Sequence, residues 1–343
     1  MEEKNYYWGN VTASIDWCEI NYEITYYIVE FWNTVSNLTM ILLPLYGLYW
    51  SFRQNRSKKL NKYRVPSSIF GCCVALILVG CGSWLFHMTL YYSMQLLDEL
   101  PMIFGSGVAL FSYLDLFISI IEFDTQLKAS DPLTRKNIVK KKIFKRSYLG
   151  LLIAIYCLFV AFIYIYIWTD PVFHQICFGL VLITALIIYI FSYWKFSNVY
   201  KIPNRLVFLI IFYAILAFTF WNIDNNFCDY LRKYRESVEV FFGISDKSFK
   251  KVEIKYICFN IMSIWLKSFS EFHSWWHIFI SYAAFLCILF LIEMSYEHHL
   301  RLTKEIDDHA RPIGSKCCDM YYFFTEENEN ECRCLSIKYI KIK

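Results

Sequence analysis

The sequence predicts an all-α protein built around a seven-transmembrane helix bundle, and its composition and its long apolar runs support this. Hydrophobic residues make up 57% of the 343 residues and aromatic residues make up 20%. Both values lie outside the range of soluble globular proteins. Several runs also reach about 20 mostly apolar residues, which is the length an α-helix needs to cross a bilayer. We therefore expect an integral, multi-pass membrane protein.

Seven runs reach that length. They lie at residues 28–50, 66–88, 94–121, 148–168, 172–194, 206–223 and 273–293. The expected organisation is a polar segment at residues 1–27, a membrane domain at 28–294 and a tail at 295–343. The long link between the last two spans contains an insert at about residues 237–270.

The distribution of basic residues predicts the orientation of these spans. Lysine and arginine are concentrated in the links at residues 51–65 and 122–147, whereas the N-terminal segment is mainly acidic. Because short cytoplasmic loops are enriched in basic residues, the N-terminus is expected outside (lumenal) and the C-terminus in the cytosol. The link before the last span also carries basic residues on the outer side, but it is long and acid-rich, so it weighs little. The net charge of +4 argues against nucleic acid as a partner, and no obligate protein partner is evident.

In that topology, three histidines and an aspartate lie at one membrane depth. His87 ends the second span, Asp98 lies near the outer end of the third, and His273 and His277 begin the last. The i, i+4 spacing of the last pair puts both imidazoles on one helix face. Three histidines with a nearby acid are the components of a catalytic zinc site. The sequence therefore predicts an intramembrane zinc hydrolase.

Two further residues suit amide hydrolysis at such a site. Asp98 is the carboxylate best placed to act as general base on a zinc-activated water. Ser83 lies four residues before His87 and shares its helix face, so its hydroxyl can stabilise the oxyanion, a contribution of about 3 kcal/mol per donor. Other readings stay open, since Ser83 after two glycines also suits a helix-packing seam. The acid at Asp98 also suits a helix start. His174 is left unassigned, because a single histidine in a membrane span is more often a packing hydrogen-bonder than a ligand.

Oxygen donors are clustered in the N-terminal segment. Asp16, Glu19, Asn21 and Glu30 provide three carboxylates and an amide, which are the ligands that calcium prefers. Their spacing is not that of an EF-hand loop, and a solvated acidic segment fits the first three equally well. Glu30 favours a cation or another partner because it lies at the boundary of an apolar run. Four cysteines in the tail, by contrast, are expected to be reduced cytosolic thiols: Cys317, Cys318, Cys332 and Cys334.

At these residues the sequence resembles the alkaline ceramidase family, within a superfamily that includes adiponectin-receptor-like proteins. The resemblance rests on motifs from the first residues to the last span. They are Tyr7-Trp8-Gly9, Ile15-Asp16-Trp17-Cys18-Glu19, Glu30-Phe31-Trp32-Asn33-Thr34, Gly82-Ser83-Trp84, His87-Met88-Thr89-Leu90, residues 95–102, Trp221-Asn222-Ile223-Asp224-Asn225 and Phe272-His273-Ser274-Trp275-Trp276-His277. The insert departs from the family pattern.

The resemblance implies an enzyme of the endoplasmic reticulum or Golgi membrane that hydrolyses ceramide to sphingosine and a fatty acid. It implies His87, His273 and His277 as zinc ligands and Ser83 and Asp98 as catalytic residues. It further implies a calcium site and a disulfide. The calcium ligands would be Asp16, the Trp17 carbonyl, Glu19, Asn21 and Glu30, and the disulfide would join Cys18 to Cys228. The alternative is a seven-helix receptor of the adiponectin-receptor type with a structural or weakly hydrolytic zinc. A transporter is less favoured because the polar residues gather at one end.

Overall fold

The computed structural model describes residues 7–56, 65–128, 132–196, 200, 204–241 and 254–309. Over these ranges the regular secondary structure is helical and no strand is present. The helices are α1 (Phe31–Ser36), α2 (Leu38–Arg56), α3 (Ser67–Thr89), α4 (Tyr92–Lys128), α5 (Pro132–Tyr166), α6 (Pro171–Phe196), α7 (Asn204–Asn226), α8 (Cys228–Phe241), α9 (Ile254–Phe269) and α10 (Phe272–His309). The all-α prediction is confirmed.

Six of these helices are long and apolar enough to cross a membrane: α3, α4, α5, α6, α7 and α10. They correspond to the second to seventh expected spans, so the chain is an integral membrane protein. The first expected span falls on α1 and α2, which are separated only at Asn37. The count of seven spans and the orientation of the termini therefore remain predictions.

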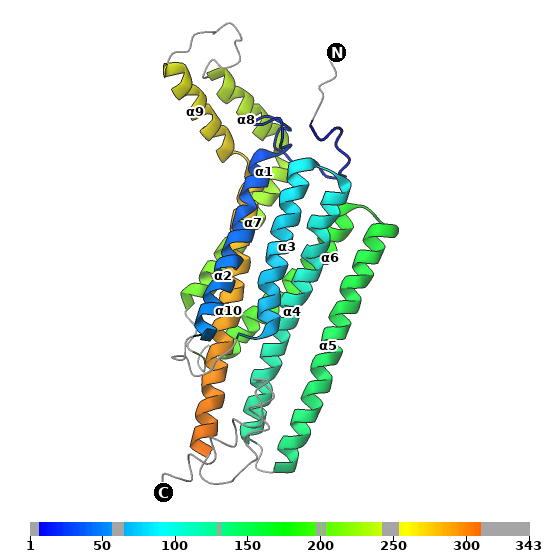
Figure 1. Ribbon diagram of the computed structural model, residues 1–343, viewed down its shortest axis with the longest axis vertical. Coiled ribbons are helices and arrows are strands. Elements are labelled where there is room, and N and C mark those ends of the chain that lie inside the picture. The colour runs from blue at the N-terminus through cyan, green and yellow to red at the C-terminus, as the bar shows by residue number, and fades with distance from the viewer. Residues whose placement is uncertain are drawn as a thin grey trace.

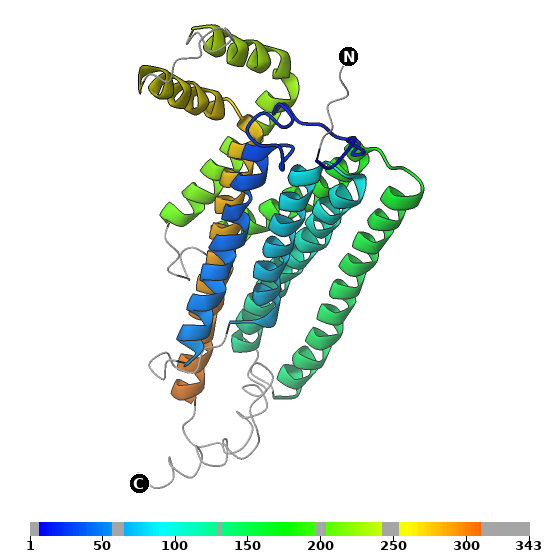
Figure 2. The ribbon, with the colours of Figure 1, turned by 45° about the horizontal axis from the view of Figure 1, so that its top comes forward.

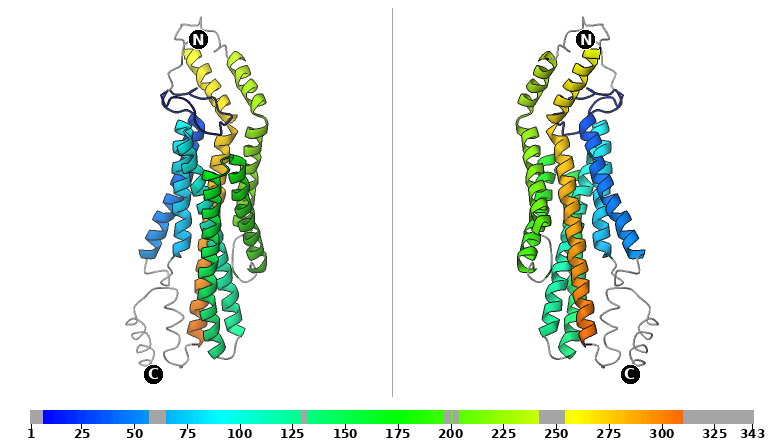
Figure 3. Two further views of the ribbon diagram at one scale, coloured as in Figure 1. Left: turned by 90° about the vertical axis from the view of Figure 1, so that its right-hand side faces the viewer. Right: turned by 90° about the vertical axis from the view of Figure 1, so that its left-hand side faces the viewer.

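The long helices run side by side as an elongated bundle (Figure 1). α3 packs against α4, α7 packs against α10, and α2 contacts both α3 and α10, while α5 packs against α4 and α6. Figure 3 shows α10 between α2 on one side and α7 on the other. A core of buried side chains, including Tyr113, Tyr189 and Phe290, fills the interior between α3, α4, α6, α7 and α10.

The N-terminal segment, residues 7–30, covers the upper end of the bundle as drawn in Figure 1. Figure 2 shows it lying over that end, where α3 stops and α4 begins. Leu90 forms the turn with a left-handed backbone at φ 48°, and its carbonyl accepts hydrogen bonds from the backbone N–H groups of Thr12 and Ala13. Trp17 and Val29 pack on Phe86 and Leu90. The segment is therefore fixed to the bundle by both backbone bonds and apolar contacts.

The described part of the link between α7 and α10, which contains the expected insert at about residues 237–270, forms two helices. α8 starts two residues after α7, and α9 ends just before α10. Both project beyond the upper end of the bundle (Figure 1), and Ile261, Trp265 and Phe269 of α9 are exposed. At the other end, α10 continues to His309, past the expected start of the tail at residue 295. The four tail cysteines lie outside the described residues.

Candidate active site and metal centre

The three predicted zinc ligands meet at the upper end of the bundle. His87 lies in the last turn of α3, and His273 and His277 lie in the first two turns of α10. Their ring centroids are 4.6 to 5.2 Å apart, and each side chain is at most 2% exposed. The three can each offer a ligand atom within 4.8 Å of the others. Among the described residues this is the one such group of three or more His, Cys, Asp or Glu side chains.

Neighbouring side chains orient two of the rings. Glu30 accepts a hydrogen bond from Nδ1 of His87 at 2.5 Å, and the Ser36 hydroxyl is 2.8 Å from Nδ1 of His277. Both contacts leave Nε2 for a metal. A carboxylate on the far nitrogen of a ligating histidine fixes its tautomer and increases its basicity.

His273 is held by its backbone and by stacking. Its ring lies 3.6 Å from that of Trp17, at an interplanar angle of 20°, and its backbone N–H donates to Asp224 at 3.2 Å. Its Nδ1 atom is buried and has no hydrogen-bond partner in the structure. A buried nitrogen without a partner fits a ligand that is completed by a metal ion.

Ser83 of α3 lies beside the histidine group, and Asp98 of the adjacent helix α4 lies beside Ser83. The Ser83 hydroxyl is 3.4 Å from Nε2 of His277 and hydrogen-bonds the Asp98 carboxylate. The two are 2% and 9% exposed. Gly82 brings the helices together, because a Cβ at that position would lie 2.1 Å from the Leu97 carbonyl oxygen. Pro101 leaves that oxygen without its usual helical donor. The close approach of α3 and α4 thus sets the serine beside the aspartate.

Glu99, on another face of α4, belongs to a separate polar network. Its carboxylate accepts a hydrogen bond from the Tyr164 hydroxyl at 2.5 Å, and Gln95 links it to Ser14 of the N-terminal segment. The His174 ring contacts the Glu99 carbonyl at 2.8 Å. His174, to which the sequence assigns no role, thus hydrogen-bonds the backbone of α4. The network joins α5 and α6 to α4 at Glu99, the residue after Asp98.

The predicted calcium ligands lie in or beside the N-terminal segment and already make other contacts, but the Asp16, Glu19 and Glu30 carboxylates do not form a group with ligand atoms within 4.8 Å of one another. Glu19 accepts hydrogen bonds from the backbone N–H groups of Trp32 and Asn33 at 2.7 and 2.8 Å. These two residues open α1, so Glu19 caps that helix. Burial and the neighbouring Glu30 carboxylate raise the pKa of Glu19 to about 8, and burial raises the pKa of Asp16. Asn21 keeps a buried Oδ1 atom without a partner. Carboxylates that resist ionisation, with a free amide oxygen, fit a cation site.

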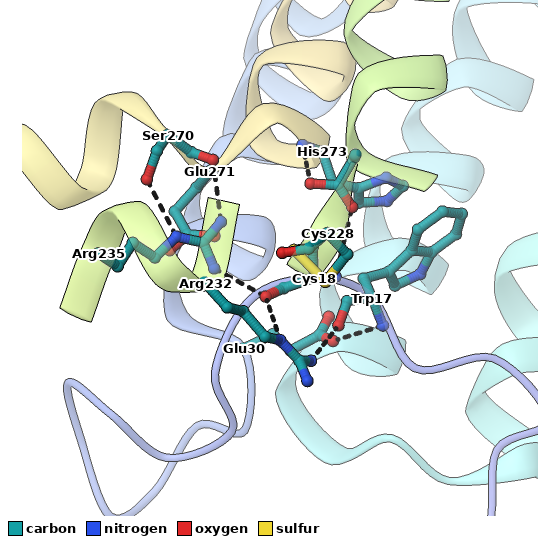
Figure 4. The surroundings of a disulfide bond; sticks show 10 residues. Trp17, Cys18, Glu30, Cys228, Arg232, Arg235, Ser270, Glu271 and His273 are labelled. Atoms are coloured by element: carbon teal, nitrogen blue, oxygen red, sulfur yellow. Dashed lines mark hydrogen bonds and ion pairs between the residues drawn. A yellow bond between two sulfur atoms is a disulfide. The ribbon is translucent and has the colours of Figure 1, made fainter. Parts of the chain in front are cut away.

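A disulfide joins Cys18 to Cys228, as the resemblance implies, with their Cα atoms 5.3 Å apart. It ties the N-terminal segment to the start of α8. Figure 4 shows the polar residues around it. Asp224 accepts from the backbone N–H groups of Cys18 and His273 at 3.3 and 3.2 Å.

Sequence reasoning gave no role to Asp224, Ser36 or Arg235. A signal existed for Asp224, which is an acid at the end of an apolar span. Ser36 resembles the many hydroxyls that bond to their own helix.

The chain is similar to members of one enzyme family. A ceramidase family model matches residues 9–247. Alkaline ceramidase 3 of Mus musculus is 33% identical over 286 residues, which cover 83% of this chain and 84% of the relative. Alkaline ceramidase YPC1 of Saccharomyces cerevisiae is 28% identical over 298 residues, covering 86% and 78%. The putative alkaline ceramidase dcd3A of Dictyostelium discoideum is 31% identical over 232 residues, covering 64% and 77%. The family model and the first of these relatives extend over most of the chain, which belongs to the ceramidase family of hydrolases.

Proposed function

We propose that this protein is a zinc-dependent membrane ceramidase that hydrolyses ceramide to sphingosine and a free fatty acid. The observation that carries the proposal is the buried group of three imidazoles with Ser83 and Asp98 beside it. Ceramide is the substrate that the names of the relatives point to. Ceramide is a membrane lipid, and six helices of this protein are long and apolar enough to cross a membrane. From the apolar runs and the basic links we infer seven spans and a lumenal N-terminus, and from the family likeness a location in the endoplasmic reticulum or Golgi membrane.

The donor set suits zinc because imidazole nitrogens are among its preferred ligands and three protein ligands leave a position open. His87, His273 and His277 would hold the ion. When bound, zinc lowers the pKa of a water molecule and polarises a carbonyl oxygen. Asp98 takes the proton from the attacking water and passes it to the departing amine nitrogen. The Ser83 hydroxyl, next to Asp98, donates to the oxyanion that develops on the amide oxygen.

We also propose that calcium binds Asp16, the Trp17 carbonyl, Glu19, Asn21 and Glu30. The support is the raised pKa of Glu19, because a divalent cation would offset the charge that burial disfavours. Glu30 would then serve two sites, since its carboxylate also bonds His87. The calcium site would be structural or regulatory, because its ligands are separate from the three histidines that would hold zinc.

The experiment is a metal analysis of purified protein combined with a ceramide hydrolysis assay with and without chelator. We expect about one zinc per chain, loss of fatty-acid release on chelation, and loss in Asp98→Asn and His277→Ala while both variants stay folded. His174→Gln is the matched control, because that buried histidine bonds only backbone and should leave zinc content unchanged. Turnover retained in Asp98→Asn or His277→Ala would remove the mechanism. Zinc bound without any ceramide hydrolysis would favour the receptor alternative.

A further inference from the structure

A deeply buried arginine lies outside the proposed reaction site, next to the helix that carries two of its histidines. Arg235 belongs to α8, and its side chain is 1% exposed. Such burial requires an opposite charge and acceptors for the guanidinium donors. Figure 4 shows its side chain reaching from α8 toward Cys18 and toward the residues that precede α10.

The guanidinium of Arg235 contacts two segments besides its own helix. Nη1 donates to the Cys18 carbonyl at 2.8 Å. Nε donates to the Ser270 hydroxyl at 3.0 Å, and Nη2 donates to the Ser270 carbonyl at 2.9 Å. Nη2 also forms an ion pair with Glu271 at 2.9 Å, and Glu271 is 2% exposed. One side chain therefore joins α8, the N-terminal segment and the start of α10.

Both of those segments lead directly to His273. Glu271 lies two residues before His273 in the chain, and Trp17, the neighbour of Cys18, stacks on the His273 ring at 3.6 Å. Asp224 adds a parallel link through its bonds to the backbone N–H groups of Cys18 and His273. A shift at Cys18 or at the start of α10 would therefore move the His273 ring relative to His87.

We propose that Arg235 is a positioning residue for the metal centre: it fixes the N-terminal end of α10 against the Trp17–Cys18 backbone, so that His273 meets His87 and His277 at ligand distance. This inference rests on the proposed function. Arg235 touches none of the three rings and acts through Glu271, Ser270 and Cys18.

The chain provides a matched control in Arg232, one helical turn earlier. Arg232 is exposed, and its contacts with the Cys18 and Trp17 carbonyls are longer, at 3.4 Å each. No contact of Arg232 with the start of α10 is present among the described residues. A variant at Arg232 therefore removes a positive charge from the same helix without releasing α10.

Removing Arg235 alone would leave Glu271 buried near Glu19 and Asp224 without the cation that pairs with it in the described part of the chain. The paired variant Arg235→Gln with Glu271→Gln removes the guanidinium contacts and leaves no unpaired buried carboxylate. Arg235→Lys retains the charge but lacks the planar fork that reaches Ser270 and Cys18 together. Changes of this kind around metal ligands typically lower metal affinity by about 10- to 100-fold.

The test measures zinc affinity of full-length protein by competition with a chelator, alongside thermal unfolding of the metal-free form. The visible absorption spectrum of the cobalt-substituted protein reports the ligand geometry. We expect the paired variant and Arg235→Lys to lose about tenfold or more in zinc affinity and to change the cobalt spectrum. Arg232→Gln should stay near wild type on both readouts.

Wild-type zinc affinity and spectrum in the paired variant would overturn the inference, even if its unfolding temperature fell. A failure of both Arg235 variants to fold would also overturn it, because Arg235 would then be a structural residue of the whole domain. These outcomes are distinct from failure of the proposed function, in which wild-type protein itself would bind no zinc or hydrolyse no ceramide.

Discussion

Gly82→Ala tests whether the contact between α3 and α4 sets the catalytic geometry. A Cβ at Gly82 would lie 2.1 Å from the Leu97 oxygen, 2.6 Å from the Leu97 carbonyl carbon and 2.9 Å from the Asp98 nitrogen, whereas ordinary contacts begin at 3.4 Å. These neighbours are backbone atoms, so no side chain can rotate away. The two helices must therefore separate by roughly 1 Å, which moves Ser83 away from Asp98.

That displacement should reduce activity more than stability. A misplacement of about 1 Å can lower the rate by about 100-fold, while overpacking typically destabilises by about 1–3 kcal/mol. The assay is the kcat for ceramide hydrolysis, measured with zinc content and thermal unfolding. Gly179→Ala on α6 is the control, because no atom lies within 4 Å of its Cβ position. It should keep the wild-type rate and gain up to about 1 kcal/mol of helix stability. A Gly82→Ala enzyme with near-wild-type kcat would refute the reasoning.

Three further predictions concern the N-terminal segment. Glu30→Gln removes the carboxylate on Nδ1 of His87, so zinc affinity should fall by about 10- to 100-fold in chelator competition; an unchanged affinity would contradict this. Replacing Cys18 and Cys228 by serine opens a link across 210 residues and should lower the unfolding midpoint, with about 2–5 kcal/mol lost; an unchanged midpoint would show that the other contacts suffice. Glu19 has a folded pKa of about 8, above its ordinary 4.5, so calcium-free protein should lose stability as pH rises through that window. Calcium favours the ionised form, so it should raise the unfolding midpoint more at about pH 8.5 than at about pH 6, and equal increments would argue against the site.

The histidine group could be predicted from sequence because the position of a residue in a membrane span sets its depth in the bilayer. Each apolar run fixes where its ends lie, and the alternation of basic links fixes which ends face the same side. His87 and the pair on α10 then share a depth without any knowledge of helix packing. The i, i+4 spacing of His273 and His277 adds a shared face.

The contacts that orient the ligands could not be predicted in this way. The Ser36 contact with His277 depends on how α1 packs against α10, and the Glu19 cap on α1 depends on the path of an irregular loop. The sequence singled out Glu30 as a boundary carboxylate in need of a partner. It did not identify His87 as that partner, because 57 residues separate the two. Periodicity locates residues on a helix, whereas loop contacts depend on the packed structure.

The N-terminal segment contributes contacts to the proposed active centre. Its backbone bonds the turn at Leu90, its cysteine is linked to α8, and its Trp17 ring covers His273. Glu30 lies at the end of this segment and makes two hydrogen bonds to His87. Its carboxylate accepts from Nδ1 of His87, and its backbone N–H donates to the His87 carbonyl at 3.0 Å. The α3 and α10 ligands are thus held by one segment that contacts both. The residues that contact metal ligands fix the orientation of those ligands. Cation binding in this segment would therefore change the geometry of the three histidines.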